Sequence, residues 1–279
     1  MKRNPRNLEE RTRRVVLEKH LSHLYSRYNP HQSMTMGELE RIKKLYGFTQ
    51  LQKYAQDAQV FQFSIDVTGW NSRFRRRLCE PVGKIFDRWF GLPAFSKIMD
   101  AYELSYFVHP TADYRYSWEG QLGGVEGLSR YFWVGSYVGI ALNVFNSLGY
   151  NYFIMDNGDD LRAAVVVPNA VVDTFPGKRE VCLDIKTRLA AALHQYGHEA
   201  KITETYGSQK LIAYSKIYFF DELAMPSIYK RIAKCHGLAN VVIPLLDQRI
   251  GSITSNAHSA CNSSTNHVPI VFVATFMIM

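Results

Sequence analysis

Two apolar runs joined through an Asn-Gly pair constrain the fold of this chain more than any other feature. The runs cover residues 150–155 and 161–167, and Asn157-Gly158 lies between them. Asn-Gly between apolar segments is the strongest short-range sign of a β-hairpin, because both residues tolerate the positive φ angles of a type I′ turn. The sequence therefore predicts an antiparallel hairpin whose turn carries Asp159.

A second β element also ends on an aspartate. Residues 60–65 alternate as a half-buried strand does, and Asp66 follows directly. Neighbouring strands of one sheet would bring Asp66 and Asp159 together. Two such carboxylates can hold a pair of Mg²⁺ or Mn²⁺ ions for an in-line displacement at a nucleotide phosphorus. Asp160 would be a third acidic residue of the site, and Asp156 is a competing candidate.

The alternative is that Asp-Asn-Gly-Asp-Asp is only a polar hairpin turn without a functional role, which is the better explanation for such a motif taken alone. The apolar strand on each side and the second aspartate-ended strand upstream favour a functional site.

A glycine-rich turn lies between these two elements, in the segment WEGQLGGVEGLSRYFW at residues 118–133. Gly123, Gly124 and Gly127 would let a backbone approach a nucleotide or a template strand, and the start of the following helix favours anions. Glu126 suits a ribose hydroxyl or a backbone N–H better than a phosphate. A tight strand-to-helix connection without a ligand is the alternative, since glycine loops alone are weak signals.

Trp70 and Asn71 follow the first aspartate. Asn71 could orient the incoming sugar or brace the carboxylate, and Trp70 could pack beneath the site, although a lone tryptophan more often belongs to the core. A basic cluster comes next: Arg73, Arg75, Arg76 and Arg77. These arginines could neutralise phosphates or form a solvated helical face.

Composition sets the broad class. The 279 residues are 47% hydrophobic, typical of a globular chain, and 33 Lys and Arg against 25 Asp and Glu give a net charge of +8. This charge fits a polyanionic partner such as nucleic acid, or a solvated basic surface. Four cysteines without a C-x-x-C pair indicate free thiols in a reducing compartment. A zinc site is a weaker alternative, because the spacings of its candidate ligands match no standard finger; the candidates are Cys235, His236, His258, Cys261 and His267.

The two ends of the chain also carry information. The charged start has no apolar segment typical of a secretory signal. The apolar run at 269–279 is shorter than the roughly 20 residues that span a bilayer. Because the chain stops within this run, we expect it to be a piece of a longer protein.

Periodicity and breakers predict the remaining elements. We expect helices at 16–28, 36–46, 81–91 (beginning at Pro81), 94–107, 125–148, 179–195 and 249–261, the last in spite of a loop-like composition. We expect further strands at 114–118, 201–205 and 211–220.

Taken together, the three segments resemble motifs A, B and C of the RNA-dependent RNA polymerase in the large (L) protein of non-segmented negative-strand RNA viruses, the Mononegavirales. The resemblance runs from about Arg14 to Pro269. Its motifs are Asp66-x-x-x-Trp70-Asn71, Trp118-x-Gly-Gln-x-Gly-Gly-x-Glu-Gly-Leu through Trp133, the Gly-Asp hairpin, and the flanks Gln32–Met36, Glu204–Ser208 and Tyr214–Tyr218.

The resemblance implies an α+β fold, a right-hand polymerase palm of antiparallel sheet and packed helices with part of the fingers. It implies fingers-side helices at 1–60, a palm with motifs A to D at 61–220, and the start of a helical region at 221–279. The implied activity is RNA-directed RNA polymerase, a nucleotidyltransferase that uses two Mg²⁺ or Mn²⁺ ions for viral replication and transcription. An inactive viral remnant that keeps the palm and at most binds RNA is the alternative.

Residue roles carry over by position. Asp66 and Asp159 would bind the metal ions. The nucleotide or template site would comprise Trp70, Asn71, Gly123, Gly124, Glu126 and Gly127. Lys201 or Lys216 would donate the proton to pyrophosphate. The implied partners are RNA template, NTPs, and a viral phosphoprotein and nucleocapsid, without a membrane. The implied location is the virion and host-cell cytoplasm, or the nucleus for some relatives.

The chain departs from the family pattern in two places. Motif C usually has Gly-Asp-Asn, whereas this chain has Gly158-Asp159-Asp160. The family's basic motif F should precede Arg14, and only residues 1–13 stand there. We therefore expect a partial viral gene or a viral insertion in a host genome.

Overall fold

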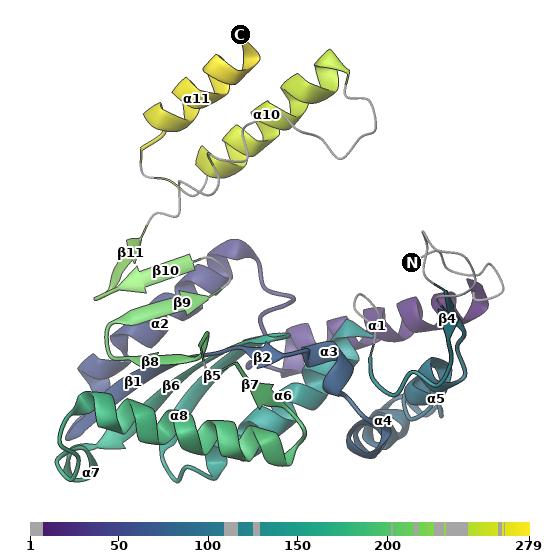
Figure 1. Ribbon diagram of the computed structural model, residues 1–279, viewed down its shortest axis with the longest axis horizontal. Coiled ribbons are helices and arrows are strands. Elements are labelled where there is room, and N and C mark those ends of the chain that lie inside the picture. Colours follow the sequence, from purple (N-terminus) through teal and green to yellow (C-terminus); the bar gives the residue numbers. More distant parts are fainter. Residues whose placement is uncertain are drawn as a thin grey trace. The chain divides into compact units, whose positions relative to one another are not determined.

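The computed structural model (Figure 1) describes residues 8–108, 117–124, 129–201, 203–214, 217–225, 232, 245–261, 264 and 266–279. At the centre of residues 8–209 lies a four-stranded antiparallel sheet. Its strand order is β5 (Asn151–Asn157), β6 (Asp160–Pro168), β1 (Ala58–Ile65) and β8 (Tyr206–Ser208). β1 pairs with β6 along its whole length, from Ala58 opposite Pro168 to Ile65 opposite Leu161. The expected α+β class with an antiparallel sheet is therefore present.

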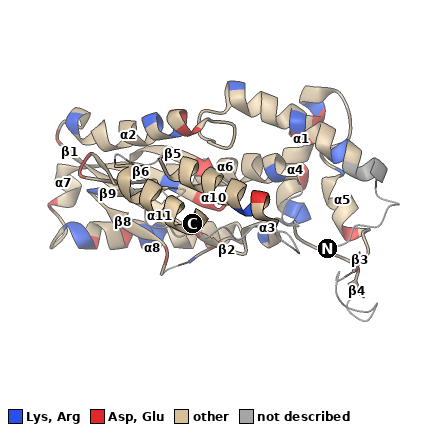
Figure 2. Ribbon diagram, turned by 90° about the horizontal axis from the view of Figure 1, so that it is seen from above, with Lys and Arg blue, Asp and Glu red and all other residues tan. Residues whose placement is uncertain are grey.

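Helices cover both faces of this sheet. Phe61, Phe63 and Ile65 alternate along β1 and pack in one core with α6 (Arg130–Asn146) and α8 (Lys178–Gln195). The opposite face of the sheet meets α2 (Glu38–Tyr54), where the Gln62 side chain donates a hydrogen bond to the Phe48 carbonyl at 2.9 Å. Figures 1 and 2 both show α2 and α8 on opposite sides of the strands.

Shorter elements complete this part of the chain. They are the helices α1 (Leu8–Tyr28), α3 (Trp70–Arg73), α4 (Arg76–Phe90), α5 (Ile98–Glu103) and α7 (Asn169–Val172), and the two-stranded sheets β2 (Val67–Thr68) with β7 (Glu199–Ala200) and β3 (Phe107–Val108) with β4 (Ser117–Trp118). α1 packs against α6, and the Tyr25 hydroxyl occupies the space that a Cβ at Gly135 would need. Gly135 thus makes room for a side chain of α1.

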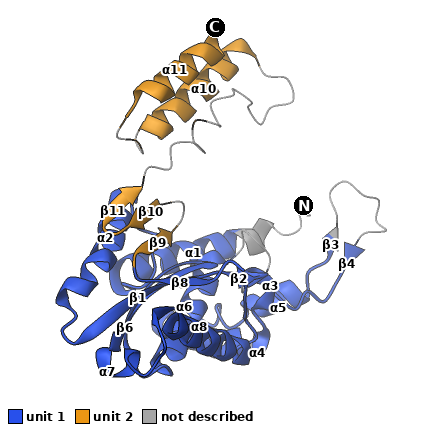
Figure 3. Cartoon of the chain, turned by 60° about the vertical axis from the view of Figure 1, so that its left-hand side comes forward, with its two compact units in different colours: residues 1–209 blue, residues 210–279 orange. Residues whose placement is uncertain are grey.

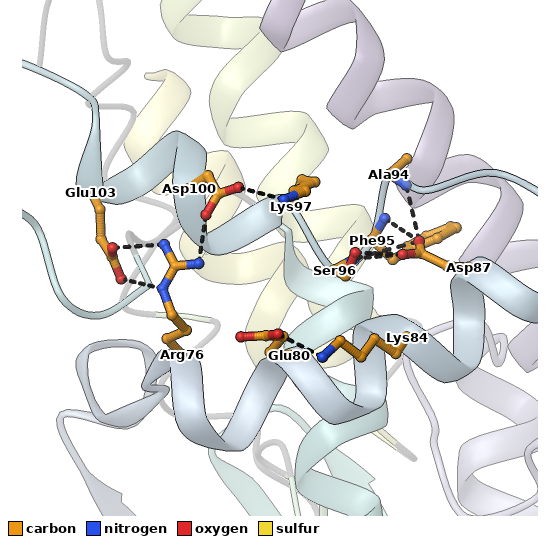
Figure 4. Close-up of polar contacts among 10 residues, drawn as sticks. All are labelled: Arg76, Glu80, Lys84, Asp87, Ala94, Phe95, Ser96, Lys97, Asp100 and Glu103. Atoms are coloured by element: carbon orange, nitrogen blue, oxygen red, sulfur yellow. Dashed lines mark hydrogen bonds and ion pairs between the residues drawn. The ribbon is translucent and has the colours of Figure 1, made fainter.

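Polar contacts join α4 to α5 (Figure 4). The Arg76 guanidinium reaches Asp100 at 2.5 Å and donates two bonds to Glu103, at 3.0 and 2.6 Å. Asp87 accepts the N–H groups of Ala94 and Phe95. The Arg76 contacts thus fasten the first turn of α4 to α5, and Asp87 fastens the last turn of α4 to the segment before α5.

α4 begins at Arg76, so the expectation that Pro81 starts the helix is wrong, and Pro81 lies inside it. The helix therefore has one turn before the proline, and ion pairs link Arg76 in that turn to the acids of α5.

Several expected elements differ from those observed. The strand expected at 201–205 is wrong: its described residues form a turn between β7 and β8, because the Lys201 N–H bonds to Asp66 and the Thr205 N–H bonds to the Lys201 carbonyl. The helix expected at 94–107 is confined to α5, and the helix expected at 36–46 extends to Tyr54. Helices at 16–28, 179–195 and 249–261 are confirmed, and the described part of 125–148 forms α6.

The chain divides into two compact units, Met1–Gln209 and Lys210–Met279 (Figure 3). The second unit contains a three-stranded antiparallel sheet of β9 (Leu211–Tyr214), β10 (Ile217–Phe220) and β11 (Leu223–Met225), so the single strand expected at 211–220 is a hairpin. It also contains α10 (Leu246–Cys261) and α11 (Val268–Ile278), which contact each other. Within the described residues, no helix is both long and apolar enough to span a membrane.

Candidate active site

The β5–β6 hairpin ends in a two-residue loop, Gly158-Asp159. Asn157 pairs with Asp160, and only Gly158 in this loop has a positive φ, of 84°. One positive φ at the first loop position is the pattern of a type II′ turn. The hairpin is therefore confirmed, but the type I′ turn expected at Asn157-Gly158 is wrong, because the register places Asn157 in the strand. Asp159 stands exposed at the tip of the loop.

Asp66 lies where β1 gives way to β2, and the turn after β7 holds it. The Lys201 N–H donates to the Asp66 carbonyl at 2.8 Å, and the Lys201 ammonium donates to Asp66 Oδ2 at 3.0 Å. Partial burial raises the pKa of Asp66, but hydrogen bonds from Glu204 and Lys201 outweigh it, so the net pKa lies below the ordinary value. Asp66 is therefore a carboxylate with a fixed cationic partner.

The two aspartates act on each other electrostatically. Partial desolvation raises the pKa of Asp159, the neighbouring carboxylates Asp160 and Asp66 raise it further, and the Lys201 charge lowers it. Burial and the neighbouring carboxylates thus both disfavour the charged form of Asp159. A bound cation would stabilise this carboxylate.

A pocket of about 680 Å³ adjoins the turn. Of the residues expected in the site, Trp70, Asn71, Gly124, Asp159 and Lys201 line this pocket. The structure thus brings together residues from three elements that are far apart in the sequence.

The pocket is also lined by residues that the sequence motifs did not single out, among them Ser72 and Arg130. The Arg130 Nη2 donates to the side-chain oxygen of Asn157 at 3.2 Å. Ser72 directly follows the expected pair Trp70-Asn71 in the sequence. Arg130 contacts a residue 27 positions away, so no local sequence pattern indicates its place in the pocket.

The glycine-rich turn packs on the backbone of α3. A Cβ at Gly123 would lie 2.3 Å from the Ser72 carbonyl oxygen, and a Cβ at Gly124 would lie 2.9 Å from that of Asn71. These two glycines are therefore required by the protein's own backbone, as the strand-to-helix alternative holds. Gly124 also lines the pocket. Glu126, Gly127 and Lys216 lie outside the described residues.

Trp70 forms the floor beneath the turn. It is 7% exposed, its ring contacts Phe74 and Tyr137 edge-on, and it lies 3.8 Å from where a Cβ at Gly158 would stand. Trp70 thus belongs mainly to the core while one edge reaches the pocket.

Asp156 and Asp160 differ from Asp159 in their surroundings. Asp156 is fully buried and no group meets hydrogen-bonding geometry at its carboxyl oxygens, so burial raises its pKa well above the ordinary value and the neutral acid is favoured. Its backbone pairs with the 31–33 segment. Asp160 lies 3.4 Å from the Arg162 guanidinium. Among these three acids, only Asp159 faces the pocket.

Two of the four clustered arginines are committed to ion pairs. Arg73 pairs with Glu199 at 2.5 Å, and Arg76 pairs with acids of α5. Arg75 and Arg77 are exposed. The cluster is therefore partly neutralised.

Mg²⁺ and Mn²⁺ fit the acids of this site. Mg²⁺ prefers hard oxygen ligands and is usually held by one or two carboxylates together with waters and substrate phosphates. Asp66 and Asp159 supply two such carboxylates. In the described parts of the chain, no three His, Cys, Asp or Glu side chains gather into a complete metal cage, so a zinc site gains no support there. Cys235 and His236 of that alternative lie outside the described residues.

Comparison with known families agrees with this arrangement. The family model described as Mononegavirales RNA dependent RNA polymerase matches residues 8–279. The chain belongs to this family.

Similar proteins come from viruses of plants and animals. The RNA-directed RNA polymerase L of Maize mosaic virus is 24% identical over 274 residues, and that of Taro vein chlorosis virus is 25% identical over 272 residues. Each alignment covers 89% of this chain and 14% of the relative. The same protein of Sendai virus (strain Z) is 28% identical over 117 residues, which are 40% of this chain and 5% of the relative. The chain thus spans about one seventh of the plant-virus relatives, at 14%.

Proposed function

We propose that this chain is the catalytic palm of an RNA-directed RNA polymerase, with part of the fingers, and that Asp66 and Asp159 hold its Mg²⁺ or Mn²⁺ ions. The observation that carries the proposal is that Asp159 lines the pocket and interacts electrostatically with Asp66, whose bonding partner Lys201 lines the same pocket. When bound, the ions would activate the attacking hydroxyl and neutralise the leaving pyrophosphate.

The residues of the chain have separate tasks in this proposal. Trp70 and Gly158 hold the turn so that Asp159 projects into the pocket. Asn71 orients the sugar of the nucleotide from the pocket wall. Lys201 lines the pocket, and its ammonium donates a hydrogen bond to Asp66 at 3.0 Å. This ammonium is the proton donor to the leaving pyrophosphate.

The roles of Asp160, of Glu126, Gly127 and Lys216, and of the partners come from the family resemblance. Template RNA and NTPs would be substrates, and a phosphoprotein and nucleocapsid would be partners of the whole protein. Placement in the virion and the host-cell cytoplasm belongs to the same proposal.

A metal-binding measurement tests the proposal on the 279-residue chain. We expect Mn²⁺ titrated calorimetrically to bind the unaltered chain and to bind Asp159→Asn much more weakly. Asp173→Asn, which removes an exposed carboxylate outside the pocket, should bind as the unaltered chain does. Equal Mn²⁺ affinity of Asp159→Asn and the unaltered chain would rule out the proposed site.

RNA synthesis by the full-length polymerase separates the enzyme from the inactive remnant. Asp159→Ala should reduce synthesis from a template with NTPs and Mn²⁺ by at least about a hundredfold, as expected when a preorganised electrostatic group is lost. Metal binding without RNA synthesis by the unaltered full-length protein would favour the remnant.

A further inference from the structure

Two cationic side chains line the pocket, and their charges are used differently. The Lys201 ammonium forms an ion pair with Asp66 at 3.0 Å. The bonding partner of Arg130 is the neutral amide oxygen of Asn157, at 3.2 Å. Within the described part of the chain, no carboxylate forms an ion pair with Arg130. The Glu18 and Asp156 carboxyl groups interact with its charge over a longer range. The guanidinium N–H groups that do not contact Asn157 can bind an anion in the pocket.

The backbone around Arg130 is held in place from two sides. Ser129 before it is buried with a φ of 57°, and its hydroxyl accepts a hydrogen bond from the Tyr102 hydroxyl at 3.2 Å. After it, the Glu18 carboxylate accepts the N–H groups of Tyr131 and Phe132, at 2.7 and 3.3 Å. The contacts of Ser129, Tyr131 and Phe132 fix the backbone position of Arg130. A binding site needs such support around the side chains that contact its ligand.

These contacts also show which group can bind an anion here. At the start of α6, two backbone N–H groups without a partner in the helix already donate to the Glu18 carboxylate. An anion at this end of the pocket would therefore meet the guanidinium rather than the helix terminus. The bond to Asn157 places this guanidinium next to the loop that carries Asp159.

The chemistry of the guanidinium selects phosphate. Arginine presents five N–H donors in a planar fork that matches phosphate oxygens. Arg130 uses one of its nitrogens on Asn157. The pocket volume of about 680 Å³ lies in the range of roughly 300–1,000 Å³ that holds small ligands. We propose that Arg130 binds the phosphate chain of the incoming nucleoside triphosphate, which rests on the polymerase function proposed above.

Calorimetric titration of the 279-residue chain with pyrophosphate, ATP, adenosine and a short RNA oligonucleotide tests this role. Arg130→Gln should weaken binding of pyrophosphate and ATP by about tenfold to a hundredfold, the scale of charge-assisted hydrogen bonds. It should leave adenosine binding unchanged. Arg130→Lys keeps the charge but loses the fork, so its affinity should lie between the two. Arg179→Gln, which removes an exposed arginine of α8 outside the pocket, should bind all four probes as the unaltered chain does.

Three outcomes would overturn the assignment. They are failure of the unaltered chain to bind pyrophosphate, equal pyrophosphate affinity in Arg130→Gln, and a loss confined to RNA, which would assign Arg130 to an RNA backbone phosphate. Thermal melting of each variant verifies that it is folded, and Arg130→Lys serves if Arg130→Gln is not. Mn²⁺ binding measured on the same samples and its dependence on Asp159 report separately on the proposed function.

Discussion

His198 is a buried histidine beneath the candidate active site, between the rings of Phe74 and Tyr137. Within the described residues, neither ring nitrogen has a hydrogen-bonding partner. Burial, and then the charge of Arg73, lowers the pKa of His198 from 6.5 to about 4. A histidine in such surroundings stays neutral in the native state, whereas the unfolded chain takes up a proton below its ordinary pKa.

This difference predicts an acid-induced loss of stability. Between pH 6.5 and about 4 the unfolded chain binds the proton and the native chain does not, so stability is full above pH 6.5 and falls as the pH drops. The loss should be on the order of 3 kcal/mol for a pKa shift of this size. His198→Phe should show a flatter dependence, measured by urea unfolding at several pH values.

Comparing the pH dependence of stability of His198→Phe with that of the unaltered chain separates the contribution of His198 from those of other titrating groups. Asp156 contributes the opposite slope, because its raised pKa makes stability fall as the pH rises above 3.8, but it is present in both proteins. Parallel pH profiles for His198→Phe and the unaltered chain would show that His198 binds its proton equally in both states.

At the scale of elements, the glycine-rich turn and α3 form one packed unit. A Cβ at Gly123 would stand 2.3 Å from the carbonyl oxygen of Ser72, and backbone atoms cannot rotate away as a flexible side chain can. We expect Gly123→Ala to lower the free energy of unfolding by roughly 1–3 kcal/mol, the range for overpacking. Urea unfolding measures this change.

Gly139 in α6 provides the matched control. Apart from its chain neighbours and the backbone of its own helix, no described atom lies within 4 Å of a Cβ built there, and its φ is not positive. Gly139→Ala should leave stability unchanged or raise it by about 0.5–1 kcal/mol, because alanine favours helix over glycine. If Gly123→Ala proved as stable as Gly139→Ala, the close approach of the two backbones would be wrong.

The elements predictable from sequence are those whose signal is local. The β5–β6 hairpin, the strand before Asp66 and the long helices follow from periodicity and breakers over short windows. The turn at 201–205 was missed because contacts with Asp66 decide it, 135 residues away along the chain. The start of α4 was missed because Arg76 reaches acids of another helix.

The same distinction applies to the site. Asp66 and Asp159 stand out because each follows or joins β-strands, and the family resemblance supported both. Arg130 stands out only in three dimensions, since its bond to Asn157 spans 27 residues. The close packing of Gly123 on Ser72 likewise has no signal beyond the glycine itself.

At the scale of the whole molecule, the site belongs to one unit. Each residue that lines the pocket precedes Gln209, as do Asp66 and all four strands of the central sheet. No described residue of the second unit, from Lys210 onward, lines this pocket. Metal binding should therefore depend on the first unit alone.

A chain of residues 1–209 tests this division. We expect it to fold and to bind Mn²⁺ with the affinity of the 279-residue chain, because it retains the sheet, the pocket and both aspartates. A chain that ends at His198 is the matched control. It lacks β7, β8 and Lys201, so it loses the strand that pairs with β2, one edge of the central sheet and the turn that holds Asp66, and we expect it to bind Mn²⁺ poorly or to unfold. Circular dichroism and calorimetric Mn²⁺ titration compare the three chains. If residues 1–209 bound Mn²⁺ no better than residues 1–198, the metal site would need the second unit, and the division of labour argued from the pocket would fail.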